Sequence, residues 1–338
     1  FTMTYKSLIQ KCFNNIKNDI IKTPLIYNSR LSNIYGANIY LKREDQQDVR
    51  SFKIRGALNK IKSIKNISNK TRIITASAGN HAQGVAYSCY KLNLNGIIYV
   101  PSTTPLQKIN RIKYFGKDNI NIKISGYTFN ESLDYSLKEV KHNDIFIHPY
   151  DDIDVINGQA TIGYEIDNDI NKDIDYVLCA VGGGGLISGV GKYFKSISNL
   201  TNIIGIEPLG AESLYKSLKE NDRVILNNID TFVDGASVSQ IGKVNYDICK
   251  NVVDSTYTVS NSRICHELVN FYQNEGIILE PAGVLSVCGL DYLDKESIKN
   301  KNIFFILSGG NNDIMRYQEI MELNLQYLDL RHYFLLKF

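Results

Sequence analysis

Short apolar runs rich in Ile, Val and Tyr recur along the chain, and between them apolar residues follow a helical spacing. Each run has the length of a strand, and several end in glycine or a polar turn. Strands that alternate with helices form parallel sheets covered by helices. The expected strands are 38–42, 72–75, 96–100, 121–124, 144–147, 176–180, 203–206 and 302–307. The pattern therefore predicts an α/β fold with two interleaved sheets.

Composition and charge narrow the possible partners. The chain has 338 residues, enough for one or two domains with a large core, and 43% of them are hydrophobic. Its 38 Lys and Arg residues against 35 Asp and Glu leave a net charge of +3, and the basic residues are scattered. Nucleic acids and acidic membranes attract a concentrated basic face, so neither is expected as a partner. A small-molecule substrate is expected instead.

The cysteines and the N-terminal stretch indicate the compartment. The six cysteines form no C-x-x-C pair and no metal-binding spacing with histidine, so we expect reduced thiols and no metal site. Lys6, Lys11 and Lys17 interrupt the apolar N-terminal stretch, unlike in a signal peptide. The longest uncharged stretch, 73–90, contains polar side chains that are costly in lipid. These features predict a cytoplasmic protein without a membrane segment.

Four consecutive glycines, 182–185, follow the apolar run 176–181 and precede a helical stretch that begins near Leu186. Backbone N–H groups of such a turn converge on an anion at the positive end of a helix, which favours a phosphate site. The dinucleotide pattern G-x-G-x-x-G and the Walker pattern both fail here. A flexible turn is the alternative, although a turn needs only one or two glycines.

The segment S-F-K-I-R-G-A at 51–57 places Lys53 beside Phe52 at the entrance of an expected helix. A lysine in a partly desolvated pocket loses proton affinity and can act as an imine-forming nucleophile and then as a base. For a lysine considered alone, a solvated surface position is the alternative.

Two further strand-to-turn segments carry polar side chains. The segment 75–83 opens a helix and suits a carboxylate, or else it is a helix cap. Ser308 follows the strand 302–307 and offers a hydroxyl above the sheet, or else it belongs to a polar turn. The acidic residues at 151, 152 and 154 are expected in a solvated loop rather than as paired catalytic carboxylates.

In order and content these motifs resemble the fold-type II pyridoxal-phosphate enzymes, and among them the biosynthetic threonine dehydratases (threonine ammonia-lyases). The likeness runs from T-P-L at 23–25 to R-Y at 316–317. It implies a tryptophan synthase β-like fold with two interleaved parallel-sheet domains and helices on both faces. It also implies pyridoxal 5'-phosphate as cofactor. The implied activity is that of a lyase of isoleucine biosynthesis, which converts L-threonine to 2-oxobutanoate and ammonia through an external aldimine and β-elimination.

The resemblance also implies a role for each matching residue. Lys53 would hold the cofactor as a Schiff base and remove the Cα proton. The other cofactor contacts would be Phe52 near the ring, Asn80 at the ring hydroxyl, Gly182, Gly183, Gly184, Gly185 and Leu186 at the phosphate, Gly235 at the cofactor face and Ser308 at the pyridine nitrogen. The substrate carboxylate would lie against Ser77, Gly79, Asn80 and His81. A neutral Ser308 would leave the pyridine a weaker electron sink, which favours elimination.

Other activities of the same class are an L-serine dehydratase and a serine racemase. The racemase family places a serine where this chain has Ala78, and a methyl group moves no proton. The racemase-like metal site at Glu207 and Ala211 is incomplete, since Ser213 stands at the last acidic position. From a different class, the alternative is a catalytically silent pyridoxal-phosphate-binding protein.

The resemblance divides the chain into domains. Residues 1–60 and 150–315 would form a large cofactor-binding domain, and residues 61–149 a small domain for the substrate carboxylate. Residues 316–338 would be the linker and first strand, at 332–338, of a missing or truncated ACT-like regulatory domain. Isoleucine inhibition is expected to be absent if the chain stops at residue 338. The family also suggests a homodimer or homotetramer.

Overall fold

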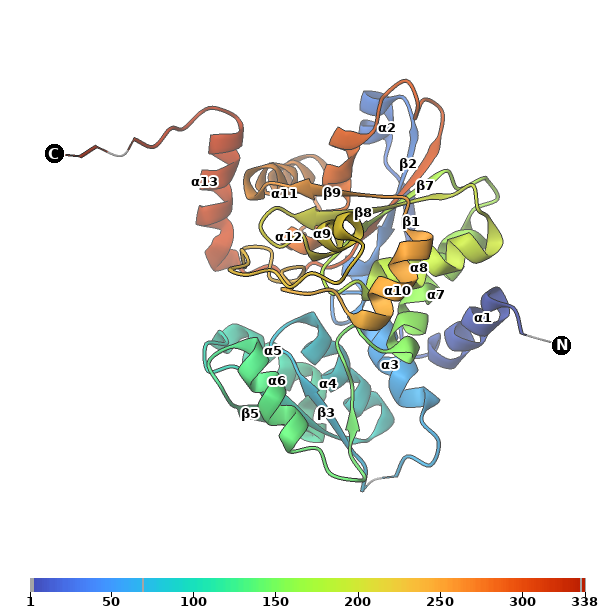
Figure 1. The fold of residues 1–338 in the computed structure, drawn as a ribbon, viewed down its shortest axis with the longest axis vertical. Coiled ribbons are helices and arrows are strands. Elements are labelled where there is room, and N and C mark those ends of the chain that lie inside the picture. The colour runs from blue at the N-terminus through green and yellow to red at the C-terminus, as the bar shows by residue number, and fades with distance from the viewer. Residues whose placement is uncertain (1–2, 69, 335, 338) are drawn as a thin grey trace.

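The computed structural model describes residues 3–68, 70–334, 336 and 337. A six-stranded sheet has the order β1-β2-β10-β7-β8-β9, and a four-stranded sheet has the order β5-β4-β3-β6. Figure 1 shows the two sheets in separate lobes. The strands are β1 (Leu25–Tyr27), β2 (Asn38–Arg43), β3 (Arg72–Ala76), β4 (Asn95–Val100), β5 (Ile120–Ile124), β6 (Ile145–Phe146), β7 (Tyr176–Ala180), β8 (Asn202–Pro208), β9 (Ser255–Val259) and β10 (Asn302–Leu307).

The helices alternate with these strands along most of the chain. The α-helices are α1 (Tyr5–Ile16), α2 (Ser29–Tyr35), α3 (Lys53–Ser63), α4 (Asn80–Leu92), α5 (Leu106–Gly116), α6 (Phe129–Lys138), α7 (Ile153–Asp169), α8 (Gly185–Ile197), α9 (Ser213–Glu220), α10 (Lys243–Val252), α11 (Asn261–Glu275), α12 (Pro281–Val284) and α13 (Tyr317–Tyr327). The 3-10 helices are η1 (Glu44–Gln46), η2 (Lys117–Asn119), η3 (Val287–Tyr292) and η4 (Ile314–Arg316). The α/β prediction is confirmed.

All eight expected strands form, and 176–180 and 302–307 have the expected bounds. Two observed strands, β1 and β9, were not expected from the sequence. Both lie at the edges of the large sheet, and β9 buries only Val259 fully. An edge strand is covered less completely, so it needs no continuous apolar run. The expectation of parallel sheets is confirmed, with one antiparallel pair at the edge of the large sheet, where β1 pairs with β2.

The large sheet is covered on both faces, as the apolar composition of its central strands requires. In β10, Phe304 and Ile306 pack with residues of α7 and α8. The alternate residues Ile303, Phe305 and Leu307 pack with residues of α11 and α12 on the opposite face. Successive side chains of a strand point to opposite faces, so one continuous apolar strand supplies both core layers.

A buried ionic network fixes the start of α3, which lies between the two lobes (Figure 1). Arg55 is fully buried, and its guanidinium donates to the carboxylates of Glu44 and Glu165 at 2.7–2.9 Å. Lys42 Nζ donates to Glu165 at 2.6 Å. Two cations face two carboxylates, so the buried charges cancel. The network joins α3 to β2, η1 and α7, and α3 begins at Lys53, two residues before Arg55.

Several helix starts are capped by a side chain of the N-cap residue. Thr4 caps α1, Asn28 caps α2, Asp152 caps α7 and Ser260 caps α11. At α6 a complete capping box forms. These side chains satisfy backbone N–H groups that have no partner within the helix.

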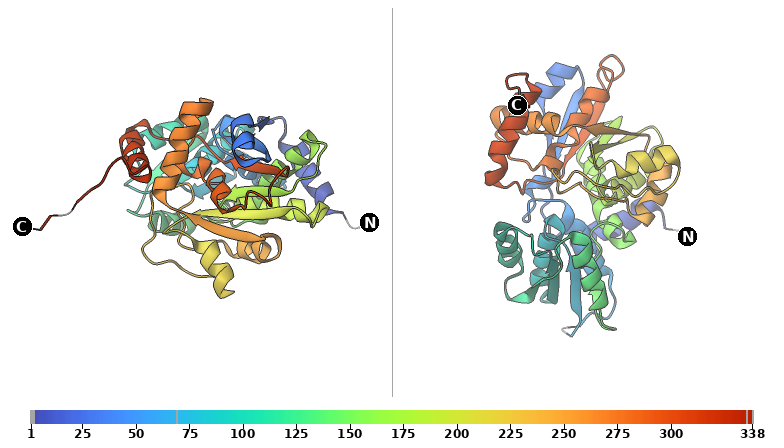
Figure 2. Two further views of the ribbon diagram at one scale, coloured as in Figure 1. Left: turned by 90° about the horizontal axis from the view of Figure 1, so that it is seen from above. Right: turned by 60° about the vertical axis from the view of Figure 1, so that its left-hand side comes forward.

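The C-terminal part of the chain forms α13 and then an extended segment that points away from the body (Figure 2). The strand expected at 332–338 includes residues 335 and 338, which lie outside the described residues. Of 331–334, 336 and 337, none belongs to a strand. A strand needs a hydrogen-bonded neighbour, and nothing in the described part of the chain supplies one to this segment.

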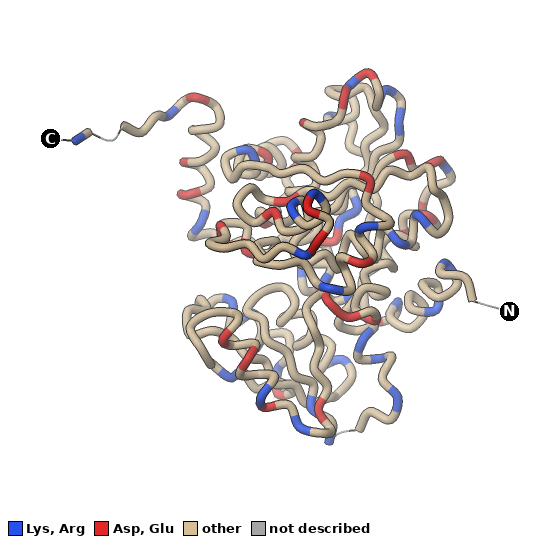
Figure 3. Tube along the Cα trace, in the orientation of Figure 1, with Lys and Arg blue, Asp and Glu red and all other residues tan. Residues whose placement is uncertain are grey.

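Charged side chains of both signs are interspersed over both lobes (Figure 3). Within the described ranges, every helix is too short or too polar to cross a bilayer.

Candidate active site

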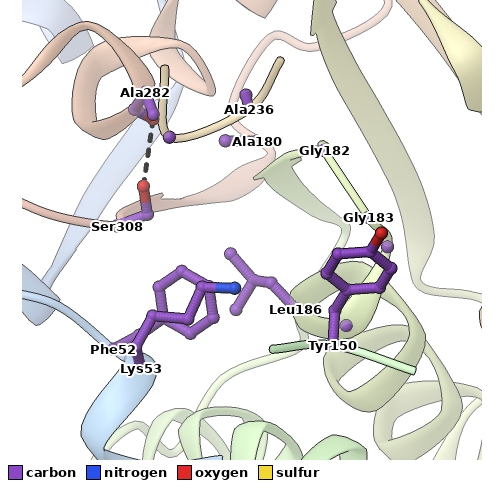
Figure 4. A pocket seen from close by; sticks show the side chains of 13 residues that line it. Phe52, Lys53, Tyr150, Ala180, Gly182, Gly183, Leu186, Ala236, Ala282 and Ser308 are labelled. Atoms are coloured by element: carbon purple, nitrogen blue, oxygen red, sulfur yellow. Dashed lines mark hydrogen bonds between the residues drawn. The ribbon is translucent and has the colours of Figure 1, made fainter. Parts of the chain in front are cut away.

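The carboxyl ends of β7 and β10 and the starts of α3 and α8 meet at a cavity (Figure 4). Ligands of parallel sheets bind at this end of the strands. The cavity is lined by Phe52, Lys53, Tyr150, Ala180, Gly182, Gly183, Gly184, Gly185, Leu186, Gly235, Ala236, Ala282 and Ser308. It therefore gathers the predicted lysine, the four glycines, the predicted serine and three further residues of the expected cofactor set.

The amine of Lys53 extends into the cavity beside Leu186 (Figure 4). Its Nζ donates to the Pro149 carbonyl at 2.9 Å and lies 5.2 Å from the centroid of the Phe52 ring. Burial lowers the pKa of Lys53 to about 8, against an opposing effect of the Glu280 carboxylate. Near neutral pH, this amine is therefore unprotonated far more often than an ordinary lysine.

The glycine turn lies opposite, between β7 and α8. Gly184, the N-cap of α8, has φ +93°, a conformation that side chains rarely adopt. A Cβ on Gly183 would lie 2.3 Å from the Tyr150 ring, so a larger residue does not fit there. The first N–H groups of a helix have no partner within it, and those of α8 start at this cavity. The turn can therefore hold an anion.

Ser308 directly follows β10 and also lines the cavity. Its Oγ donates to the Ala282 carbonyl at 3.0 Å, and its own carbonyl accepts from the Phe52 N–H at 3.1 Å. Ser51 also pairs with Gly309 in an isolated bridge. These backbone contacts hold the start of α3, and with it Lys53, next to a neutral hydroxyl.

An amine, an anion-binding turn and a hydroxyl thus share one cavity. These groups match the aldehyde, the phosphate and the ring nitrogen of pyridoxal 5'-phosphate. A sequence model of the family described as pyridoxal-phosphate dependent enzymes matches residues 16–309. The chain belongs to this family. Its cofactor is pyridoxal 5'-phosphate.

Known proteins also share high sequence identity with this chain over most of their length. The protein named biosynthetic L-threonine dehydratase IlvA in Halalkalibacterium halodurans is 47% identical over 324 residues, 96% of this chain and 78% of that protein. The Bacillus subtilis protein of the same name is 46% identical over 331 residues, 98% of this chain and 78% of that protein.

Solved structures of the same architecture are also similar. The processed form of threonine deaminase isoform 2 from Solanum lycopersicum has a TM-score of 0.87 at 39% identity, covering 94% of this chain and 93% of that chain. Maize serine racemase has a TM-score of 0.85 at 25% identity, covering 95% and 98%. The fold of this pyridoxal-phosphate dependent enzyme is thus the fold-type II architecture.

The predicted carboxylate-binding segment of the enzyme is at the start of α4, outside the set that lines the cavity. Asn80 Nδ2 donates to Glu280 at 2.6 Å, and Asn80 Oδ1 accepts from Asn311 at 2.8 Å. The Gly79 N–H donates to Ser77 Oγ at 3.2 Å. The roles assigned to Ser77, Gly79, Asn80 and His81 stay predictions.

The His81 ring is turned to the Ile147 carbonyl, 3.1 Å from its Nε2. Since a carbonyl only accepts, the ring carries its proton on Nε2. Burial, together with the nearby Lys53 ammonium, lowers the pKa of His81 to about 3. The ring is therefore neutral, so it offers no positive charge to a carboxylate.

Tyr150 and Glu280 belong to the site region but were not predicted from the sequence. Tyr150 lines the cavity and follows β6, a strand of the small sheet, and its position after the carboxyl end of a strand could have indicated it. Glu280 is buried, and this burial, reinforced by Asp234, raises its pKa to about 7 although Asn80 donates to it. It is the only charged residue between 276 and 290, a signal that the sequence did contain.

Glu207, which stands at the racemase-like metal position, binds backbone N–H groups of its own chain. The carboxylate of Glu207 accepts from the N–H groups of Leu214 and Tyr215 at 2.8 and 2.6 Å. Burial raises the pKa of Glu207 to about 8. In the described part of the chain, no group of three His, Cys, Asp or Glu side chains is placed to hold a metal ion.

Proposed function

We propose that this enzyme dehydrates and deaminates L-threonine to 2-oxobutanoate and ammonia. The observation that carries the proposal is the Lys53 amine, which faces the glycine turn and Ser308 across one cavity. Relatives at 45–47% identity that bear the name biosynthetic L-threonine dehydratase support threonine as substrate.

The cavity residues fit the cofactor. Lys53 would bind its aldehyde carbon, and Ser308 would lie at its ring nitrogen. The phosphate would rest on Gly182, Gly183, Gly184, Gly185 and Leu186, while Phe52 and Gly235 would flank the ring. Asn80, which lies outside the lining of the cavity and contacts Glu280, would bind the ring hydroxyl. When bound, the cofactor stabilises negative charge that develops at the substrate Cα.

Lys53 is suited to move the Cα proton. A general base is most effective when its pKa lies near the working pH, and that of Lys53 is lowered by burial to about 8. The Pro149 carbonyl gives the free amine a fixed acceptor, which restricts the directions it can take. Placement of this kind contributes roughly 10²–10⁴-fold to the rate.

Ser308 favours elimination over other outcomes. A hydroxyl that already donates to the Ala282 carbonyl offers no ionised partner to a protonated ring nitrogen. Beside this neutral hydroxyl, a bound cofactor would withdraw charge less strongly, which would favour departure of the β-hydroxyl over reprotonation at Cα.

The start of α4 would receive the substrate carboxylate. Gly79 is its N-cap, so N–H groups of the first turn are available at the positive end of the helix. We assign this contact to Ser77, Gly79, Asn80 and the backbone of His81, whose neutral ring is directed to Ile147.

The two sheets support the proposed division into a large domain (1–60 and 150–315) and a small domain (61–149). We keep residues 316–338 as a proposed linker towards a regulatory domain, and a cytoplasmic homodimer or homotetramer as the proposed state.

Product analysis with both amino acids tests the function. We expect 2-oxobutanoate from L-threonine at a higher kcat/KM than pyruvate from L-serine. D-serine as the main product would identify a racemase, against the expectation from Ala78. Cofactor absorbance without any product would identify a silent binding protein.

A further inference from the structure

The turn 148–151 approaches the cofactor site from the end of the small sheet, and it is held together by its own histidine. His148 Nδ1 accepts from the N–H groups of Tyr150 at 3.2 Å and Asp151 at 2.8 Å. The ring nitrogen is therefore unprotonated. Burial of His148 lowers its pKa, although Asp151 opposes the shift, and the lowered pKa keeps this acceptor available.

Asp151 joins this turn to a helix that is distant in sequence. Its Oδ2 accepts from the Lys243 N–H at 2.9 Å, and its Oδ1 accepts from the N–H groups of Val244 and Asn245 at 2.8 and 3.3 Å. These are the first N–H groups of α10, whose N-cap, Gly242, has no side chain to cap them. A Cβ on Gly242 would lie 2.4 Å from Asp151 Oδ1. The carboxylate thus takes the place of a local cap.

The start of α10 in turn contacts the glycine turn. The Gly242 N–H donates to the Gly183 carbonyl at 3.2 Å. A Cβ on Gly184 would lie 2.9 Å from the Cβ of Asn245, so the two backbones are in close contact. Asn245 Nδ2 donates to the Tyr150 carbonyl at 3.0 Å, and the Tyr150 ring covers Gly183. Turn 148–151 and α10 therefore enclose the glycine turn from two sides.

We infer that Asp151 is a positioning residue of the cofactor site. By holding the turn against α10, it fixes the Pro149 carbonyl that accepts from Lys53 and the Tyr150 ring that covers the glycine turn. Together with the Asn245 contact to Tyr150, this carboxylate holds the amine in place relative to the phosphate site. The expectation that Asp151 is a solvated loop residue is corrected by these contacts.

The neighbouring Asp152 provides a matched control. Its Oδ1 accepts from the N–H groups of Asp154 and Val155, so it caps its own helix, α7, and its Oδ2 pairs with Lys60 at 2.8 Å. Both aspartates cap a helix start, and only Asp151 connects α10 to the turn that contacts Lys53. Asp151→Ala and Asp152→Ala therefore both remove a helix cap, and an effect that comes from cap loss alone should appear in both.

The test compares Asp151→Ala, Asp151→Asn and Asp152→Ala in the full chain. The first readout is the Kd for pyridoxal 5'-phosphate. The second is the pH midpoint of Lys53 acetylation by acetic anhydride in the cofactor-free chain, measured by mass spectrometry. The titratable groups around Lys53 are Glu280, His81 and His148, and all three variants retain them.

We expect Asp151→Ala to raise the Kd about fivefold or more and to move the acetylation midpoint upwards, towards that of an exposed lysine. Asp151→Asn, which keeps an acceptor oxygen, should show a smaller change in both. Asp152→Ala should lose comparable thermal stability and change neither. If Asp151→Ala does not fold, the Asp151→Asn and Asp152→Asn pair takes the same test.

The inference would be overturned if the Asp151 and Asp152 variants changed the Kd and the acetylation midpoint equally. It would also be overturned if neither variant changed either quantity. It rests on the cofactor and not on threonine as substrate. Acetylation involves no turnover, so this result stands apart from the outcome of the product analysis.

Discussion

The starts of α6 and α8 satisfy the same kind of backbone groups in opposite ways. At α6, Thr128 Oγ1 accepts from the Glu131 N–H, and Glu131 accepts from the Thr128 N–H, each at 3.2 Å. At α8 the N-cap is Gly184, which has no side chain, and the helix start faces the cavity that we propose as the cofactor site. α6 caps itself, whereas we propose that α8 leaves its first N–H groups to the cofactor phosphate.

The same contrast applies more widely. The N-cap of α4 is Gly79, near the site, and the N-cap of α10 is Gly242, so that Asp151 caps this helix from a distance. In contrast, α1, α7 and α11 have the N-caps Thr4, Asp152 and Ser260, whose side chains cap the helix start. A local cap stabilises the fold, whereas a glycine at the N-cap leaves the same N–H groups to a partner from elsewhere, such as Asp151 at α10. Substitutions at a locally capped helix start should therefore change stability, whereas substitutions at the glycine turn before α8 should change cofactor affinity.

The largest effect is expected at the start of α3, where the first helical residue is the candidate nucleophile. Lys53→Ala should remove the cofactor absorbance of the imine and lower kcat by at least about 10³-fold, because both the covalent attachment and the base are lost. Lys60→Ala is the matched control, since Lys60 lies on the same helix and pairs with Asp152 and Asp154. Retention of turnover in Lys53→Ala would contradict the assignment.

A second prediction concerns how this buried amine couples stability to pH. The folded chain lowers the pKa of Lys53 from 10.5 to about 8, so below pH 8 the folded state carries the cost of burying the charge. Between pH 8 and 10.5 the unfolded chain binds more protons at this lysine than the folded chain does. The free energy of unfolding of the cofactor-free chain, relative to that of cofactor-free Lys53→Met, should therefore rise with pH by up to about 3 kcal/mol. Urea unfolding of both chains at several pH values measures this difference. A difference that is constant with pH would show that the amine is well solvated.

A smaller effect is expected at the glycine turn. Gly183→Ala would place a methyl group against the Tyr150 ring, and relief of such a clash costs about 1–3 kcal/mol, or roughly 5–150-fold in the Kd for the cofactor. The control is Gly36→Ala at the C-cap of α2, where φ is +68° and a Cβ would meet no described atom within 4 Å. It should cost stability and leave the Kd unchanged. Equal Kd values in both variants would argue against a built phosphate site.

The smallest effect is expected at α6. Thr128→Ala should lower the free energy of unfolding by about 1 kcal/mol through loss of the cap, with no change in cofactor affinity. Thermal unfolding and a cofactor titration check the two halves of this prediction. A weaker cofactor affinity in Thr128→Ala would contradict the expectation that the α6 cap serves stability alone.

The sequence predicted the central strands because apolar runs such as 302–307 are buried on both faces. It did not predict β9, whose residues Ser255 to Thr258 are only partly buried at a sheet edge. Local periodicity carries information about burial, and an edge strand gives little of it.

The proposed cofactor set was accessible from the sequence because Lys53, the glycine turn and Ser308 each lie in a local motif at a strand or helix end. The supporting residues were not. Asp151 caps a helix that starts 92 positions later, and Glu280 meets Asn80 across 200 positions. Such contacts depend on the packing of separate elements, which no local pattern encodes.

The most direct test of the account is to identify the lysine that holds the cofactor. The chain loaded with pyridoxal 5'-phosphate is reduced with borohydride, digested and analysed by mass spectrometry. We expect one phosphopyridoxyl group per chain, on Lys53, with other lysines unmodified. Modification of another lysine, or none at all, would contradict the assignment of this cavity as the cofactor site.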